Sequence, residues 1–174
     1  MNRLIKLSII VLLSGWVHLL FADEEGQWQR MKRGMLPDNP MPVDMLTPVD
    51  SKRWYVCRAH YNKAMHPGKL SQQSRACLIT VSGRTNRAPH YEVLLKQADY
   101  IWQAYQTGPI PENAVIGGAE DADEAYLLYI CRVQRKKAWV AGKILKPGTG
   151  CQIERNGRAY TMRKFEILVK KAKD

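Results

Sequence analysis

Two lysines follow glycines at matching places in the chain, in the stretches AMHPGKL (residues 64–70) and AWVAGKI (residues 138–144). Lys69 and Lys143 are separated by an offset of 143 − 69 = 74 in the numbering. A lysine ammonium donates three hydrogen bonds and carries a full positive charge, so it can orient a ligand rich in acceptors. A lone lysine after a glycine is most often a solvated side chain on a turn. Its recurrence at a fixed offset makes ligand binding a serious alternative to that structural interpretation.

The residue types that usually carry catalysis do not form a recognisable set. Beyond the N-terminal leader, the histidines lie only in the first half of the chain, at His60, His66 and His90. No Ser-His-Asp arrangement or metal-ligand spacing accompanies them. The acidic run EDADE (residues 120–124) lacks the spaced ligands and terminal bidentate glutamate of a calcium loop. We therefore expect a protein that is not an enzyme and that needs no metal or cofactor.

Residues 1–22 predict a secretory signal peptide. Arg3 and Lys6 precede an apolar run that ends at the small residue Ala22, and acidic residues follow. An uncleaved signal anchor is the alternative, although Gly15 and Trp16 interrupt the run. Either way the domain would lie outside the cell, and we expect a secreted, extracellular protein.

The charge of the chain favours anionic partners. The full sequence of 174 residues has a formal net charge of +11, and loss of Arg3 and Lys6 with the leader leaves +9. Such a surface suits anionic polysaccharides or acidic lipid headgroups, and solubility alone is the plainer explanation. The leader argues against nucleic acid as a partner.

The mature chain contains one unit used twice. Sliding the sequence by the same offset aligns Trp28–Leu95 with Trp102–Val169 without a gap, and 18 of the 68 aligned positions are identical. Composition alone would give about 4 matches over this length. We divide the chain into a first copy (residues 23–95), a connector (96–101) and a second copy with its basic tail (102–174).

Four cysteines obey the same offset. They are Cys57, Cys77, Cys131 and Cys151, and the interval within each copy is equal, 77 − 57 = 20 and 151 − 131 = 20. This spacing is far from that of zinc sites, and an even number in a secreted chain favours disulfides. We favour Cys57–Cys77 and Cys131–Cys151, while two crossed schemes also respect the repeat, and four free buried cysteines are the remaining alternative.

Each copy is expected to be a series of short strands. The stretches 54–61 and 126–133 are rich in aromatic and β-branched residues, and shorter apolar runs begin at Cys77 and Cys151. Ser82-Gly83 and Asn156-Gly157 predict hairpin turns, and we also expect turns at Gly-Lys. No stretch keeps a helical period. The sequence thus predicts an all-β protein in which two tandem repeats form an intertwined, pseudo-twofold antiparallel β-sheet or sandwich.

Two charged positions are also identical in both copies: Arg58 matches Arg132, and Glu92 matches Glu166. For these we favour a structural role, in a buried or half-buried ion pair or in backbone hydrogen bonds that hold the pseudo-symmetric interface. Trp28 and Trp102 are expected in the core, although a tryptophan at a rim could stack on a sugar.

The second copy resembles the DM-nine repeat family. The resemblance is carried by Trp102, GPIPENAVIGGAEDADEAYLLYICRV, AGKI, GCQI, NGR and FEIL, and it extends over both copies. Characterised relatives are β-rich, mannose-binding lectins of invertebrate immunity, and some of them dimerise. The resemblance therefore implies a secreted pattern-recognition lectin for glycans on microbial or cell surfaces, and it allows a homodimer.

The resemblance also implies a sugar site. An aspartate after the Gly-Gly pair would act with the Gly-Lys lysine, which here designates Asp121, Asp123 and Lys143. A carboxylate accepts from two sugar hydroxyls while an ammonium donates to another. The first copy keeps Lys69 but lacks both glycines, and its Asp50 aligns with Glu124 rather than with either aspartate. We therefore expect one complete site and one degraded or altered site.

Three functions remain open at this point. The first is the mannose-type lectin, and the second is a basic protein that binds polyanions or membrane surfaces without a sugar pocket. The third is a structural component without a ligand. High salt would abolish the second mode and largely spare the first.

Overall fold

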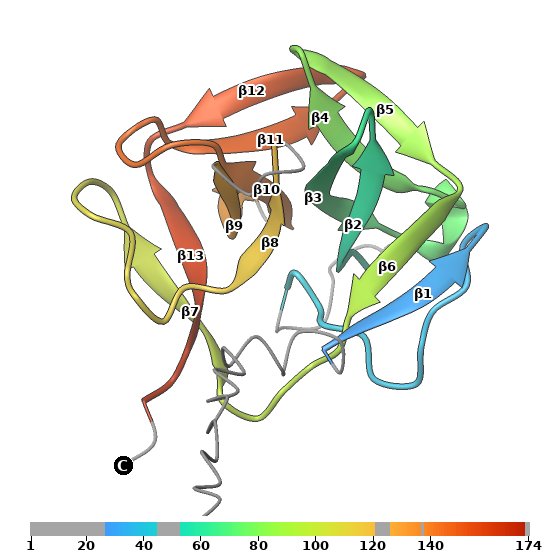
Figure 1. Ribbon diagram of the computed structural model, residues 1–174, viewed down its shortest axis with the longest axis horizontal. Helices are drawn as coiled ribbons and strands as arrows, with labels where there is room; N and C mark the ends of the chain where they lie inside the picture. Colours follow the sequence, from blue (N-terminus) through green and yellow to red (C-terminus); the bar gives the residue numbers. More distant parts are fainter. Residues whose placement is uncertain (1–26, 45–52, 121–125, 137, 173–174) are drawn as a thin grey trace, which may run out of the picture.

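The protein is built almost entirely from β-strands. The computed structural model describes residues 27–44, 53–120, 126–136 and 138–172, and the all-β prediction is confirmed (Figure 1). One short 3-10 helix, Gln72–Ser74, occurs within these ranges. None of the helices in the described ranges is long and apolar enough to cross a bilayer. The predicted leader at residues 1–22 lies outside the described part.

Thirteen strands share one antiparallel sheet. Those of the first copy are β1 (Trp28–Lys32), β2 (Tyr55–Tyr61), β3 (Ala64–Leu70), β4 (Cys77–Val81), β5 (Arg84–Ala88) and β6 (His90–Leu94). Those that follow are β7 (Tyr100–Tyr105), β8 (Ile116–Ala119), β9 (Leu127–Arg135), β10 (Ala138–Ile144), β11 (Cys151–Arg155), β12 (Arg158–Met162) and β13 (Phe165–Lys170).

The strand order reads the same from both ends. It runs β1-β6-β2-β3-β4-β5-β12-β11-β10-β9-β13-β7, so each first-copy strand has its counterpart at the mirrored place. The sheet curls round on the two sides of Figure 1, and the halves meet at β5 and β12. Because β8 lies off this path and pairs with both β3 and β9, a strand of the second copy bonds directly to the first.

The hairpin tips join the two halves. Ser82 and Gly83 have φ of 49° and 76°, and Asn156 and Gly157 have φ of 51° and 81°. Two positive φ values in a row are typical of the two-residue turns that fit the twist of a hairpin, so both predicted turns are confirmed. The Thr85 amide donates to the Gly157 carbonyl (3.1 Å) and the Ala159 amide to the Gly83 carbonyl (3.0 Å).

Both predicted disulfides, Cys57–Cys77 and Cys131–Cys151, are present, with Cα atoms 6.0 and 5.9 Å apart. Cys57 lies on β2 and Cys77 on β4, which flank β3 on opposite sides. Neighbouring strands are about 4.8 Å apart, so two strands this close across a third require a sharply curled sheet. Gly68 on β3 pairs with Cys57 of β2 and with Ile79 of β4, so it lies between the two strands that the first disulfide joins.

The expected turn at Gly-Lys is wrong. Gly68-Lys69 and Gly142-Lys143 lie within β3 and β10. A Cβ on Gly68 would lie 2.2 Å from the Leu78 carbonyl oxygen, and one on Gly142 would lie 2.1 Å from that of Gln152. The glycines are therefore needed because the next strand approaches too closely for a side chain, rather than because the chain reverses.

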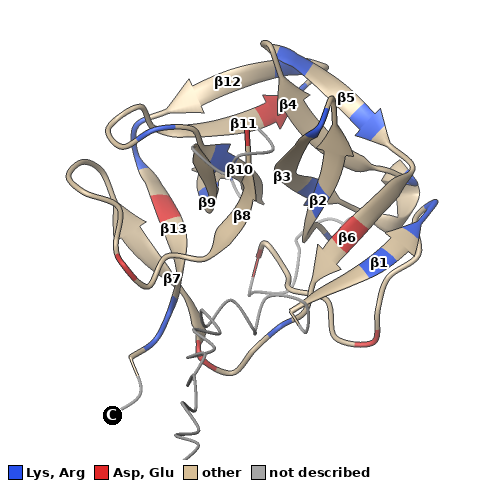
Figure 2. Ribbon diagram, viewed as in Figure 1, with Lys and Arg blue, Asp and Glu red and all other residues tan. Residues whose placement is uncertain are grey.

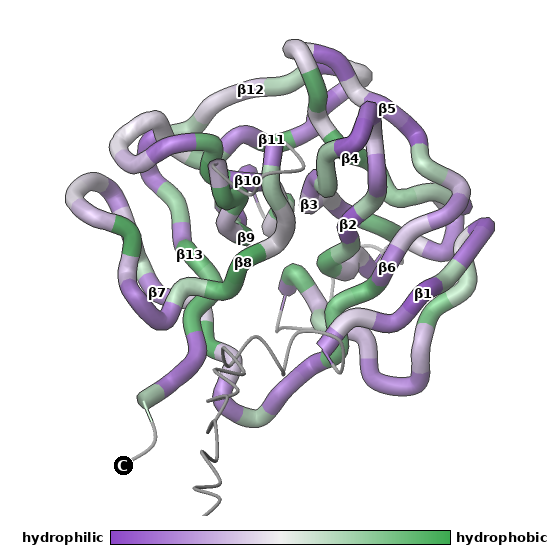
Figure 3. The backbone as a smooth tube through the Cα atoms, in the orientation of Figure 1, coloured by the Kyte–Doolittle hydropathy of each residue, from purple (hydrophilic) through white to green (hydrophobic). Residues whose placement is uncertain are grey.

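Apolar side chains form three clusters. One belongs to the first copy and includes Cys57 and Ile79, and another belongs to the second copy and includes Cys131 and Ile153. The third draws on both copies. Its full buried membership is Trp28, Met41, Val43, Val56, Leu94, Tyr100, Val115, Ile130, Ala141 and Leu168. In Figure 3 apolar segments concentrate on β9, β13 and β8, whereas β1 and β5 are largely hydrophilic.

Of the structural roles expected for the repeated arginines and glutamates, ion pairs form, but each lies within one copy rather than between the copies. Arg58 Nε is 2.7 Å from Glu92 Oε2, across β2 and β6. Arg132 Nη2 is 2.6 Å from Glu166 Oε2, across β9 and β13. Only Arg132 also reaches the other copy, where its Nη1 donates to the Val43 carbonyl (2.7 Å). The guanidinium groups stack on Trp28 and Trp102. Trp28 is a core residue, as expected, whereas Trp102 is only partly buried and packs against the same cluster.

Candidate functional site

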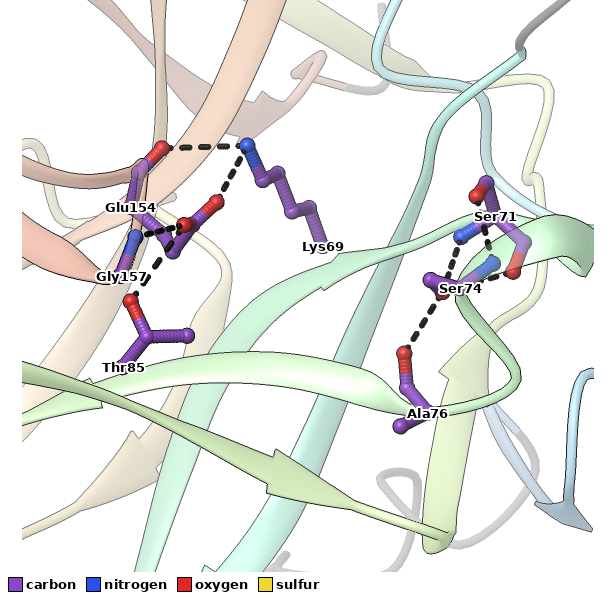
Figure 4. Close-up of polar contacts among 7 residues, drawn as sticks. All are labelled: Lys69, Ser71, Ser74, Ala76, Thr85, Glu154 and Gly157. Atoms are coloured by element: carbon purple, nitrogen blue, oxygen red, sulfur yellow. Dashed lines mark hydrogen bonds and ion pairs between the residues drawn. The ribbon is translucent and has the colours of Figure 1, made fainter.

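Lys69 of β3 is held by the opposite copy. Its Nζ lies 2.7 Å from Glu154 Oε2 and donates to the Glu154 carbonyl at 3.0 Å, as Figure 4 shows. The ammonium also faces the Trp54 ring at 4.6 Å. Glu154 on β11 is fixed in turn by the Gly157 amide (3.1 Å) and the Thr85 hydroxyl (3.3 Å). Lys69 is therefore a member of a closed structural network between the copies.

Burial alone would raise the pKa of Glu154. The hydrogen bond and charge of Lys69 outweigh it, with help from the Gly157 amide and Thr85, so the pKa lies below its ordinary value. The carboxylate is thus charged at neutral pH and neutralises the buried ammonium.

Lys143 of β10 has a different environment. Only 1% of the residue is exposed, and its Nζ lies 3.0 Å from Nδ1 of His66 on β3 of the first copy. Within the described ranges, this imidazole is the one hydrogen-bond partner of the ammonium, which has three hydrogens to donate. A carboxylate holds Lys69, whereas a neutral ring nitrogen holds Lys143.

The pair has shifted pKa values with a clear cause. Burial lowers the pKa of Lys143 to about 8, while the charge of Glu120 partly opposes the shift. Burial, followed by the charge of Lys143, lowers the pKa of His66 to about 4. At pH 7 the ammonium is therefore mostly charged, and the imidazole is neutral and accepts at Nδ1.

The structure brings together only part of the predicted site. It places Lys69 and Lys143 on adjacent halves of the sheet, both buried and both directed at the opposite copy. Asp50, Asp121 and Asp123 lie outside the described residues. Glu120, which precedes the two second-copy aspartates, is exposed at the end of β8 and interacts electrostatically with Lys143.

The Gly117-Gly118 pair has a structural role as well. A Cβ on Gly118 would lie 2.0 Å from the Met65 carbonyl oxygen, and one on Gly117 would lie 2.8 Å from Pro67. The glycines let β8 pass against β3 of the first copy. They therefore fix the path of β8 up to its end at Ala119.

Sequence reasoning missed the partners of both lysines. Residue 154 − 74 = 80 is Thr80, and 66 + 74 = 140 is Val140, so neither Glu154 nor His66 is matched across the repeat. The sequence offered one indication of these partners: each is a polar residue next to an apolar residue in a segment that forms a strand.

Comparison with known proteins identifies the family. A search of curated proteins finds no match to this chain. The family model described as DM9 repeat matches residues 48–162, which is 115 of the 174 residues and includes both lysines and all four cysteines. The chain belongs to the DM9 repeat family.

Proposed function

We propose that the protein is a secreted lectin that recognises mannose-type glycans on microbial or cell surfaces, as a pattern-recognition protein of innate immunity. It would act by binding rather than by catalysis. Membership of the DM9 repeat family is consistent with carbohydrate binding. The two disulfides suit an oxidising, extracellular environment, in keeping with the predicted leader.

The environment of Lys143 is the observation that carries the proposal. Among the described residues the buried ammonium has a single neutral partner, which uses one of its three hydrogens, and a buried donor without an acceptor is costly. Sugar hydroxyls are acceptors of the required kind, and carboxylates beside the ammonium would accept from the neighbouring hydroxyls. Asp121 and Asp123 follow Glu120 closely in the sequence and are the proposed carboxylates.

The first copy is proposed to contribute less to sugar binding. The charge of Lys69 is already matched by Glu154 at 2.7 Å, and a ligand would have to break that buried pair. Breaking a buried pair costs about 3–5 kcal/mol. Lys69 and Asp50 are thus the weaker of the two predicted ligand sets.

A glycan array tests the proposal with the mature protein and a Lys143→Met variant, at moderate and at high salt. Methionine keeps most of the length of the buried side chain and removes the ammonium. We expect binding to mannose-type glycans that survives high salt and falls at least about tenfold in the variant, as for the loss of one charge-assisted hydrogen bond.

Lys164→Ala is the matched control, because it removes one positive charge from an exposed position of the same copy. Binding only to anionic glycans, lost in salt and equal in the two variants, would instead support the polyanion-binding alternative. That result would remove Lys143 from the site.

A further inference from the structure

A cavity lies in the first copy, and neither Lys69 nor Lys143 lines it. Its volume is about 540 Å³, within the range of small-molecule sites. Strands β1, β2, β4, β5 and β6 contribute to its wall, and neither Lys143 nor His66 lines it. A ligand site in this cavity would therefore be separate from the proposed sugar site at Lys143.

The cavity exists because two strands diverge. Strand β2 pairs with β6 only at Cys57–Val93 and Arg58–Glu92. Beyond these pairs, β2 continues against β3 while β6 continues against β1, so the sheet opens between them. Ala59, Ile79 and Ala88 line the opening with small or aliphatic side chains.

The same divergence occurs in the second copy, where β9 and β13 pair only at Arg132–Glu166 and Cys131–Ile167. At three of the matched positions the side chains are larger there. Residues 31, 59 and 88 are Met, Ala and Ala in the first copy, and 105, 133 and 162 are Tyr, Val and Met in the second. Tyr105 packs on the Phe165 ring with centroids 5.3 Å apart. At these three positions the first copy thus leaves more room than its counterpart.

Cationic groups surround this space. Arg30, Arg58 and Arg87 line it with one glutamate, Glu92, which gives +3 − 1 = +2 before the two histidines, His60 and His90, are counted. Basic segments of β1, β2 and β5 and the acidic segment of β6 are visible in Figure 2. Arg87 is fixed by donation to the Ser74 carbonyl, so its guanidinium is oriented before a ligand arrives.

We propose that this cavity binds an acidic sugar residue, with the anionic group against the arginines and the ring against the apolar floor. Arginine suits sulfate and carboxylate because its planar fork donates two parallel hydrogen bonds. Exposed Tyr61 at the edge offers an aromatic face to the C–H side of a sugar ring. Glu92 pairs with Arg58 at 2.7 Å and with Arg30 at 3.5 Å, and it can neutralise only one of the three arginine charges. A neutral sugar would therefore leave the net charge of the lining unmatched.

Calorimetric titration of the mature protein tests the proposal. The probes are a sulfated disaccharide, an unsulfated uronic-acid disaccharide, a neutral mannose disaccharide and inorganic sulfate, all at one moderate salt concentration. We expect at least one acidic disaccharide to bind about tenfold or more tightly than the neutral one and than sulfate. Sulfate binding as tightly as the disaccharides would overturn the sugar assignment, and equal binding of the neutral disaccharide would overturn the anionic one.

Two variants locate the binding. Ala88→Met installs the residue that the second copy carries at this place, and it should abolish binding of the acidic disaccharide while the thermal midpoint is kept. Arg30→Gln should weaken binding about tenfold, whereas Arg158→Gln, an equal loss of charge on exposed β12, should not. Unchanged binding in Ala88→Met, or equal losses in the two arginine variants, would contradict the site. Mannose-glycan binding through Lys143 is unaffected by either variant, so the two proposals fail separately.

Discussion

His66 links the charge of Lys143 to the acid stability of the fold. The pKa of His66 is about 4 in the folded protein and 6.5 in its ordinary state, so between these values the unfolded chain binds more protons. Stability should therefore fall as the pH drops from 6.5 to 4. The loss is on the order of 3 kcal/mol.

A His66→Gln variant should remove this part of the pH dependence, since a glutamine oxygen can accept from Lys143 and does not titrate. Chemical unfolding at pH 7 and pH 4.5 measures the difference, with exposed His60→Gln as the control. A decline in His66→Gln as steep as in the unmodified protein would show that the imidazole is not responsible.

At the scale of single residues, the sequence identified the residues that recur in both copies, but not the residues that bind to Lys69 and Lys143. The repeated arginines and glutamates were given a structural role, and both disulfides were favoured, because each recurs at the offset of the repeat. Lys69–Glu154 and Lys143–His66 could not be found this way, because each joins a repeated residue to one present in a single copy. Comparison of the two copies therefore cannot predict contacts that are made in only one of them.

Strand β10 depends on Gly142 for its close approach to β11. A Cβ at Gly142 would lie 2.1 Å from the Gln152 carbonyl oxygen, and the backbone cannot yield without separating the two strands. Gly142→Ala should therefore destabilise the protein by about 3 kcal/mol or more, the range of severe core changes. Gly148→Ala is the comparison, since Gly148 has φ of 77° and open space around it, and its cost is about 1–2 kcal/mol of backbone strain. Thermal or chemical unfolding ranks the two, and similar losses would refute steric exclusion at β10.

The elements themselves were predictable where pattern and turn chemistry agree. The stretches 54–61 and 126–133 became β2 (55–61) and β9 (127–135), and both Gly-containing hairpin turns formed. The Gly-Lys segments were read as turns because glycine usually marks a turn or a weak strand. The close carbonyl that requires glycine there belongs to another strand and leaves no trace in the local sequence.

The molecule as a whole is held together by contacts between its halves. They include the reciprocal hydrogen bonds at the tips of β5 and β12, the pairing of β8 with β3, and a core cluster drawn from both copies. Lys69–Glu154 and the donation of Arg132 to Val43 add buried polar contacts across the same boundary. A copy of about 70 residues buries little by itself, and chains of that size are marginally stable even with a complete core.

Neither copy should therefore fold alone. Residues 97–174, expressed separately with their disulfide, should lack a cooperative unfolding transition, because Glu154 loses Lys69, Arg132 loses the Val43 carbonyl and one edge of β8 loses β3. Mixing them with residues 23–96 should restore the near-ultraviolet circular dichroism of the whole protein, since the missing contacts are non-covalent. Lys69→Met in the first fragment should weaken this reassociation, because it leaves the Glu154 carboxylate buried without its counter-charge. A cooperative transition in residues 97–174 alone would mean that the halves are independent domains and that the contacts between them only orient one copy against the other.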